Sequence, residues 1–479
     1  MLRKFSRAFV CISVLTIVGI GNSLAYSPVA TCNLSDSNFD SWFVSGKASK
    51  NGPVTFANSV DFPEENTVCD FYKWSHQMFL WVTSPAGQSI VLESALFYDV
   101  IFDAEGNGTY VSSSEDSNKF NLRGAKPQRI QAAGQAGGGD TLLTLNGSLV
   151  YFGINVNDVY AWFNTAVTNG VITPDTVPFP TTMGELQSIT QYAADNGVSL
   201  TDADALTMEF KTAWVDILSI AEQDRNDYIT IEATVPNYVG NLGDETWTVD
   251  SKKPIIQKSL ALVGMHVVGP VSGHPEMVWA TIEHAKNAPD NNYYVESPIS
   301  FPGPIVHEIP YNSAGQWNFM ANGGEREGAL ESQMVVGPKK TPKCDSGEIC
   351  ATTSNGIVHN NVYRAMPWGN APTKESANNN SQLISLNNDI RGFLVGDDVR
   401  QHYFLSGAVW TRDGSVPVDG NDTAEQVGSK LLANTTMETY HQTDVKGCFG
   451  CHNNHGNDKE RGTYVSHLFS LNNKPLVPK

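Results

Sequence analysis

The stretch LALVGMHVVGPVSGHPEMVWATIEH, at residues 260–284, gives the clearest indication of how this chain folds. It lies within a region from Tyr228 to Pro298 that is rich in Val, Ile, Thr and Trp. Because β-branched and aromatic side chains fit the pleated surface of a sheet, we expect this region to form strands. Residues 99–109 predict a further pair of strands, which would be joined by a turn at Asn107-Gly108.

Helices are expected on both sides of this strand-rich region. In CDFYKWSHQMFLWV, at residues 69–82, the aromatic and apolar side chains recur every three or four positions, which is typical of a buried helix. Four further helices are predicted, at residues 158–167, 184–195, 202–219 and 423–440, and loops are predicted at residues 132–139, 310–356 and 369–382. The expected fold class is therefore α+β, with a strand-rich body, several helices and a short helical C-terminal segment.

The first 25 residues have the pattern of a signal peptide. The basic residues Arg3, Lys4 and Arg7 precede the apolar run 8–20, and Ser23-Leu24-Ala25 supplies small residues for cleavage. We therefore expect export to the periplasm or the medium, with cleavage near Ala25. A lipid anchor on Cys32 is the competing interpretation.

The remainder of the chain is divided into a body, residues 26–420, and a C-terminal segment, residues 421–479. No stretch after the signal peptide has the run of about 18 apolar residues that a membrane-spanning helix needs, so no transmembrane segment is expected in the mature chain. The chain has 31 Lys and Arg against 50 Asp and Glu, a formal net charge of −19. This balance argues against nucleic acid as a partner, because nucleic-acid binding depends on basic side chains.

The seven cysteines separate into three groups. Cys11 leaves with the signal peptide, and Cys448 and Cys451 belong to a C-terminal motif. The four that remain are an even number in an oxidising compartment, which predicts two disulfides. The pairs nearest in sequence are Cys32–Cys69 and Cys344–Cys350, while the two other connectivities stay open.

The C-terminal motif is Cys448-Phe449-Gly450-Cys451-His452, a complete C-x-x-C-H sequence. This spacing lets two thiols bond to the two vinyl groups of one haem while the histidine that follows binds the iron as its proximal ligand. A zinc site would need a second pair of ligands, and Cys344 and Cys350 match that spacing poorly. A thioredoxin-like site would need a βαβ context, which the sequence lacks. The motif therefore predicts one covalent haem c, and residues 421–479 are its attachment segment.

A second iron ligand on the distal side is a separate question. His266, within the apolar run 260–268, is the first candidate because a rigid strand holds an imidazole well. His467 and Met437 follow as candidates, and an open iron position is the alternative to all three. A hydrogen-bonded core histidine is the other interpretation of His266. A metal site built from His274 with Glu283 and His284 is a further alternative.

Several stretches together resemble a family of large, exported bacterial mono-haem cytochrome c proteins with a C-terminal C-x-x-C-H motif. The matching pieces lie between Cys69 and His452. They are residues 69–74 (CDFYKW), 78–81 (MFLW), 264–266 (GMH), 278–284 (VWATIEH), 432–440 (LANTTMETY) and the motif itself. The resemblance implies haem binding and electron transfer, and it implies no particular substrate or reaction.

The function predicted from these features is that of a periplasmic c-type cytochrome that transfers electrons. The acidic chain would suit a basic redox partner, although the sequence identifies none. The alternative is a haem-dependent redox enzyme, peroxidase-like or oxygenase-like, with an open iron position and a substrate pocket in the body. The size of the body favours this alternative, because electron carriers with a single haem are usually small. The sequence leaves open whether the chain is catalytic.

Overall fold

A computed structural model gives the fold of the chain. It describes residues 31–102, 107–112, 140–173, 179–300, 304–337, 344–345, 347–418, 424–443, 447–453, 462–470 and 475–476. The predicted signal peptide (1–25) and the predicted glycine-rich loop (132–139) lie outside these residues. Within the described part of the chain, no helix is long and apolar enough to cross a membrane.

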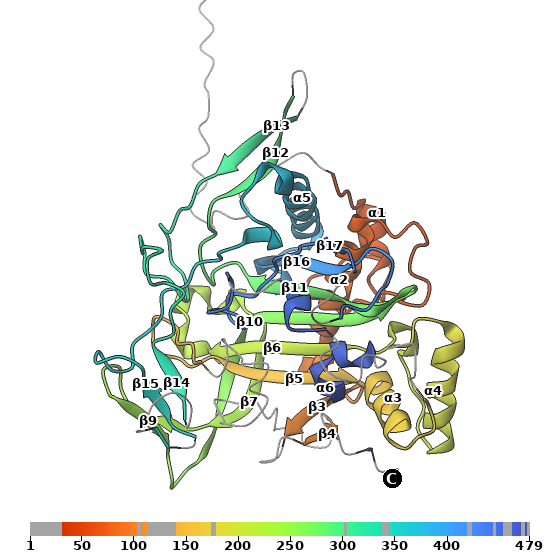
Figure 1. Ribbon diagram of the computed structural model, residues 1–479, viewed down its shortest axis with the longest axis horizontal. Coiled ribbons are helices and arrows are strands. Elements are labelled where there is room, and N and C mark those ends of the chain that lie inside the picture. The colour runs from red at the N-terminus through yellow and green to blue at the C-terminus, as the bar shows by residue number, and fades with distance from the viewer. Residues whose placement is uncertain are drawn as a thin grey trace, which may run out of the picture.

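A nine-stranded antiparallel sheet forms the centre of the molecule (Figure 1). Its order is β17-β16-β11-β10-β6-β5-β3-β4, and β7 pairs with the first part of β10. The bounds are β3 Phe97–Phe102, β4 Gly108–Ser112, β5 Tyr151–Asn157, β6 Glu209–Asp216, β7 Thr230–Pro236, β10 Ile255–Val271, β11 His274–His284, β16 Tyr403–Thr411 and β17 Gln426–Gly428. The predicted strands within 228–298 and at 99–109 are confirmed, but the turn predicted at Asn107-Gly108 is wrong, since Gly108 begins β4 and pairs with Phe102.

The two longest strands, β10 and β11, form the hairpin at the centre of this sheet. One edge of β10 pairs with β6, and the other edge pairs with β7 at Ile255–Ala261 and then with β11 from Gly264 onward. Its residues from Leu260 to Val271 are buried apart from His266, which is only partly covered. Since both faces of the hairpin are covered, the sequence of 260–284 is nearly continuously apolar instead of alternating.

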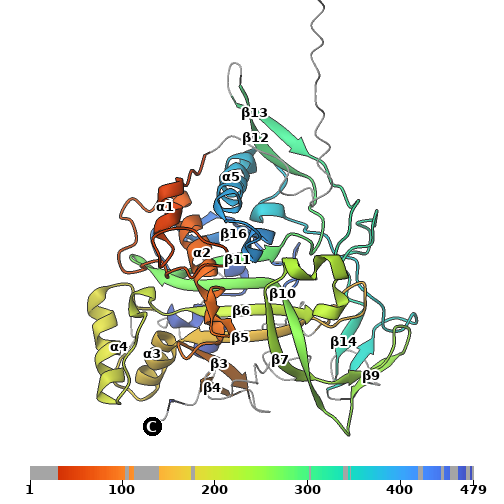
Figure 2. The same cartoon turned by 180° about the vertical axis from the view of Figure 1, so that it is seen from behind.

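Three of the helices and the C-terminal segment cover opposite faces of the sheet. α2 (Val68–Val82) packs on β16, β11 and β10, with Phe71 stacked on Trp410 at a centroid distance of 4.0 Å. α5 (Ala377–Phe393) lies beside α2, and α1 (Asp36–Ser41) contacts α5. The C-terminal segment, blue, is on the near side of the sheet in Figure 1, whereas α2 is on the near side in Figure 2.

Smaller elements surround this core. α3 (Asp158–Thr168) and α4 (Met183–Asp195) pack on each other, and α3 contacts β5 and β3. The hairpin β12 (Tyr293–Ser300) and β13 (Pro304–Ile309) projects from the body in both views (Figures 1 and 2). The small sheets consist of β14 (Met334–Val336), β15 (Ile349–Ala351), β9 (Thr246–Val249) and β8 (Tyr238–Val239), and of β1 (Pro85–Ala86) and β2 (Ser89–Ile90).

Three of the predicted helices are confirmed as α2, α3 and α4, but two others are wrong. Residues 202–219 contain the strand β6, which pairs with both β5 and β10. Within 424–443 the chain forms β17 and a series of turns. The loop predicted at 369–382 is also wrong from Ala377 onward, where α5 begins. Between 310 and 356 the described residues are mostly loop, with β14 and β15 as short exceptions.

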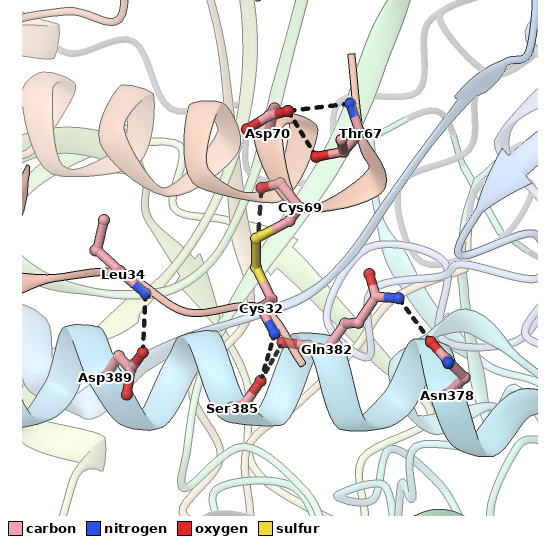
Figure 3. The surroundings of a disulfide bond; sticks show 9 residues. All are labelled: Cys32, Leu34, Thr67, Cys69, Asp70, Asn378, Gln382, Ser385 and Asp389. Atoms are coloured by element: carbon pink, nitrogen blue, oxygen red, sulfur yellow. Dashed lines mark hydrogen bonds between the residues drawn. A yellow bond between two sulfur atoms is a disulfide. The ribbon is translucent and has the colours of Figure 1, made fainter. Parts of the chain in front are cut away.

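Both predicted disulfides are confirmed, Cys32–Cys69 and Cys344–Cys350. The first joins the N-terminal segment to α2 and lies beside α5 (Figure 3). There the backbone N–H of Cys32 donates to Ser385 Oγ at 3.4 Å, and that of Leu34 donates to Asp389 Oδ2 at 3.1 Å. The disulfide to α2 and the two hydrogen bonds to α5 therefore hold the N-terminal segment on two helices.

Candidate haem-attachment site

The C-x-x-C-H motif lies in a single tight turn. Cys448–Gly450 forms a short 3-10 helix, and the backbone N–H groups of Cys451 and His452 donate to the carbonyl oxygen of Cys448 at 3.1 and 2.8 Å. Gly447, just before it, has φ +71°, and a side chain there would overlap the carbonyl oxygen of Lys430. Glycine is thus required both for the backbone angle and for the close approach.

The two motif thiols differ from the other cysteines that the structure describes. Neither Cys448 nor Cys451 is in a disulfide, whereas the remaining four cysteines are paired. Cys448 is partly buried and Cys451 is exposed. Burial, followed by the negative charge of Glu438, raises the pKa of both thiols. Reactive C-x-x-C cysteines of disulfide oxidoreductases instead have lowered pKa values, so this environment argues against that activity.

His452 is held by one hydrogen bond and two aromatic rings. Its Nδ1 lies 2.9 Å from the carbonyl oxygen of Val465, and because a carbonyl only accepts, Nδ1 carries the proton. The ring lies 4.0 Å from Trp279 and 4.1 Å from His467, centroid to centroid. Burial, followed by the charge of His467, lowers the pKa of His452 well below its ordinary value, so the imidazole is neutral.

The segment before the motif is fixed to the face of the sheet. Gly264 on β10 makes room for it, since a Cβ there would lie 2.5 Å from Thr436 Oγ1 and 2.8 Å from Asn434 Oδ1. Thr435 donates to Glu283 from both its N–H and its hydroxyl. Met437 is fully buried among apolar side chains that include Ala213 and Val263.

A buried ionic network lies under the same segment. The guanidinium of Arg364 pairs with Glu283 at 2.9 Å and with Asp290, and all three side chains are almost completely buried. Ser406 also donates to Glu283 Oε1, at 3.4 Å. The carboxylate of Glu283, which binds Thr435, is therefore itself fixed. The segment that leads to the motif is thus held to the sheet through this residue.

A charged trio, Lys211, His266 and Glu438, lies beside the motif on the same face of the sheet. Lys211 on β6, His266 on β10 and Thr281 on β11 are direct neighbours across the strands. Glu438 accepts hydrogen bonds from His266 Nε2 at 3.0 Å and from Lys211 Nζ at 3.4 Å. Burial would raise the pKa of Glu438, but the charges of His266 and Lys211 lower it to about 2, so the carboxylate is ionised.

The three candidates for the distal iron ligand all make other contacts. His266 has Thr281 Oγ1 at Nδ1 and Glu438 at Nε2. His467 donates from Nε2 to the carbonyl oxygen of Cys451 at 3.1 Å and stacks on His452. His467 would therefore have to leave both contacts to bind a haem iron held by His452. Met437 lies in the core described above.

The alternative metal site is not formed. His274 and His284 lie at opposite ends of β11, and Glu283 pairs with Arg364. His274 contacts Glu276 at 2.9 Å, and His284 contacts the carbonyl oxygen of Asp227 at 3.1 Å. The one group of potential metal ligands found in the described residues is Cys344, Glu348 and Cys350, whose two cysteines form a disulfide.

Several site residues could not be identified from the sequence. Val465 contributes only its backbone carbonyl, and because every residue has one, the sequence does not indicate this role. Lys211 and Glu438 lie in two segments, 202–219 and 423–440, that the sequence predicts as helices, so nothing in the sequence brings them together. Trp279, between Val278 and Ala280, has the sequence surroundings of an ordinary core residue. Each depends on contacts between residues far apart in the chain.

The donor set of the motif suits a covalent haem. Two thiols outside disulfides lie three positions apart, and His452 is neutral with its proton on Nδ1, which leaves the Nε2 lone pair for iron. A hydrogen bond from the second ring nitrogen to a carbonyl is the usual way in which a metal-binding histidine is oriented. Comparisons with protein-family models, curated proteins and solved structures found no match to this chain.

Proposed function

We propose that this protein is a periplasmic c-type cytochrome that carries one covalent haem c and transfers electrons. Cys448 and Cys451 would hold the haem through thioether bonds, and His452 would be the proximal iron ligand. The haem would supply one-electron exchange between ferric and ferrous iron. The segment 421–479 would be the attachment segment and residues 26–420 the body that supports it.

One observation carries this proposal. His452 is the last residue of the C-x-x-C-H turn, and its Nδ1–H donates to the carbonyl oxygen of Val465. The two thiols of the turn are outside disulfides. The contact with Val465 selects the tautomer whose Nε2 can bind iron and fixes the plane of the ring. Trp279 and His467, on the two sides of the ring, restrict its rotation and shield it from water.

The residues of the chain also support electron transfer in a general way. The motif is held by the central sheet through Gly264, Glu283 and Trp279, so the iron ligand would move little between oxidation states. Fast electron exchange benefits from such rigidity, because a preorganised site has little to rearrange. The net charge of −19 would suit a basic redox partner.

A haem-dependent redox enzyme is the second candidate, and one observation favours it. His266, His467 and Met437 are each engaged in other contacts, as described above, and His266 would have to give up a hydrogen bond to bind iron. An iron without a sixth protein ligand could bind oxygen or peroxide. The body would then hold the substrate pocket.

Absorption spectra of the purified oxidised and reduced protein separate the two candidates. A low-spin spectrum that does not change with carbon monoxide supports electron transfer with a sixth protein ligand. A high-spin spectrum that responds to carbon monoxide or peroxide supports the enzyme. The variant His266→Ala then tests the first ligand candidate, since loss of a true ligand turns a low-spin haem high-spin and allows carbon monoxide to bind.

A further inference from the structure

We propose that the opposite charges of Lys211 and Glu438 set the reduction potential of the haem attached to the neighbouring motif. This inference rests on the proposed function, since it requires a haem at Cys448 and Cys451. It goes beyond that function by assigning to two residues outside the motif a role that can be measured.

The first step of the argument is position. Lys211, His266 and Thr281 form a row across β6, β10 and β11. Trp279, whose ring lies 4.0 Å from His452, is two residues from Thr281 on the same strand, hence on the same face and about 7 Å away. The charged trio is therefore next to the aromatic ring against which His452 packs.

The second step is burial. The side chains of Lys211 and Glu438 are 17% and 28% exposed. Charges that are largely removed from water are screened much less by solvent and salt than surface charges, so their field extends farther.

The third step is the fixed geometry of the carboxylate. Glu438 accepts from Lys211, from His266 and from the backbone N–H of Asn434, the last at 2.9 Å. Three donors hold one carboxylate, so the negative charge stays at one place relative to the motif. His266 acts here as a positioning residue, since it links Glu438 to Thr281 on the sheet.

The signs of the two effects follow from electrostatics. Reduction adds one negative charge to the haem iron. A fixed negative charge nearby opposes reduction and lowers the midpoint potential, whereas a fixed positive charge favours reduction and raises it. Removing Glu438 and removing Lys211 should therefore shift the potential in opposite directions, which a merely structural defect would not do.

The experiment is a redox titration of the full-length protein matured in a host that attaches haem c, with covalent haem measured separately for each variant. Glu438→Gln, which keeps the size of the side chain, should raise the midpoint potential. Lys211→Met should lower it, and Lys211→Arg should leave it near the wild-type value. Lys258→Met is the matched control, because Lys258 also pairs with an acid, Asp216, but lies eight residues before His266 on β10.

Opposite shifts, with no shift in the control, support the inference. Wild-type potentials in both Glu438→Gln and Lys211→Met would overturn the inference. The proposed function would stand in that case, because those variants would still carry covalent haem. Shifts of the same sign in both variants would also overturn the inference, because they indicate a common structural disturbance. A wild-type protein without covalent haem would overturn the inference and the proposed function together.

Discussion

The Nδ1 atom of His452 lies 2.9 Å from the carbonyl oxygen of Val465, thirteen residues later in the chain. This contact connects the C-x-x-C-H turn to the short helical pieces η11 (Gly462–Val465) and α6 (His467–Ser470) that follow it. The same region packs on the sheet through Val465, Leu468 and Phe469, which are buried. The orientation of the proposed iron ligand is thus tied to the core of the body.

Gly264 should be intolerant of even a single added methyl group. Gly264→Ala places a Cβ 2.5 Å from Thr436 Oγ1, so the segment at 434–438 must shift. Overpacking of this kind costs about 1–3 kcal/mol of unfolding free energy, which chemical denaturation would measure. The control is Gly392→Ala on α5, where a Cβ meets nothing within 4 Å and alanine should be neutral or stabilising. Equal effects of the two changes would contradict the tight packing at Gly264.

Arg364 should be one of the most sensitive charged residues. Arg364→Met leaves the buried carboxylates of Glu283 and Asp290 without a cation, and loss of one partner of a buried pair costs about 3–5 kcal/mol. Denaturant titration would measure the loss. Arg412→Met is the control, since the Arg412–Glu425 pair is exposed and should have little effect. A stability of Arg364→Met that equals the wild type would contradict the anchoring role of this network.

The two disulfides should contribute unequally to stability. Cys32–Cys69 spans 37 positions and Cys344–Cys350 spans only 6. By the chain-entropy relation, their removal should cost roughly 4 and 2 kcal/mol respectively. Denaturation of the paired serine variants, Cys32→Ser with Cys69→Ser and Cys344→Ser with Cys350→Ser, would measure this difference. Non-reducing peptide mapping that found either pair joined differently would contradict the connectivity itself.

Glu209 should make stability depend on pH. Burial raises the pKa of its carboxyl to about 7, and Ser466 Oγ donates to it at 2.6 Å. Because the folded state holds this proton more tightly than the unfolded chain, the contribution is present below about pH 4.3 and is lost as the pH rises through 7. Glu209→Gln imitates the protonated form and should remove this part of the dependence.

The measurement for Glu209 is the difference in unfolding free energy between Glu209→Gln and wild type from pH 4 to pH 8. It should favour the variant increasingly as the pH rises, by up to a few kcal/mol, since one pKa unit corresponds to about 1.36 kcal/mol. A difference that is constant over this range would show that the carboxyl has the same pKa in the folded and unfolded states, which would contradict the prediction. Other carboxyl groups with raised pKa values, such as Asp99, contribute equally to both proteins.

The sequence predicts those elements whose pattern is local. The helix α2 follows from the spacing of its aromatic residues, and β10 and β11 follow from a long apolar run with β-branched residues. The disulfides follow from counting the cysteines of a chain that is predicted to be exported. The motif is also local, because the proposed thioether attachment of a haem would require this spacing of Cys448, Cys451 and His452.

The remaining features depend on contacts between distant residues. In the segment containing β6, Leu206, Phe210, Ala213 and Trp214 have helical spacing, but pairing with β5 and β10 decides in favour of a strand. The segment 434–438 takes its shape from side chains seated on the sheet at Gly264 and Glu283. The charged trio arises only when β6, β10 and this segment are brought together.

The most direct test of the central claim is haem retention after acid–acetone extraction. The protein, purified from an export-competent host with a haem c maturation system, should keep its haem, and Cys448→Ala with Cys451→Ala should lose it. The matched control is Cys344→Ala with Cys350→Ala, which removes two cysteines elsewhere and should keep the haem. A wild-type protein that releases its haem into the solvent, or never acquires one, would contradict the account.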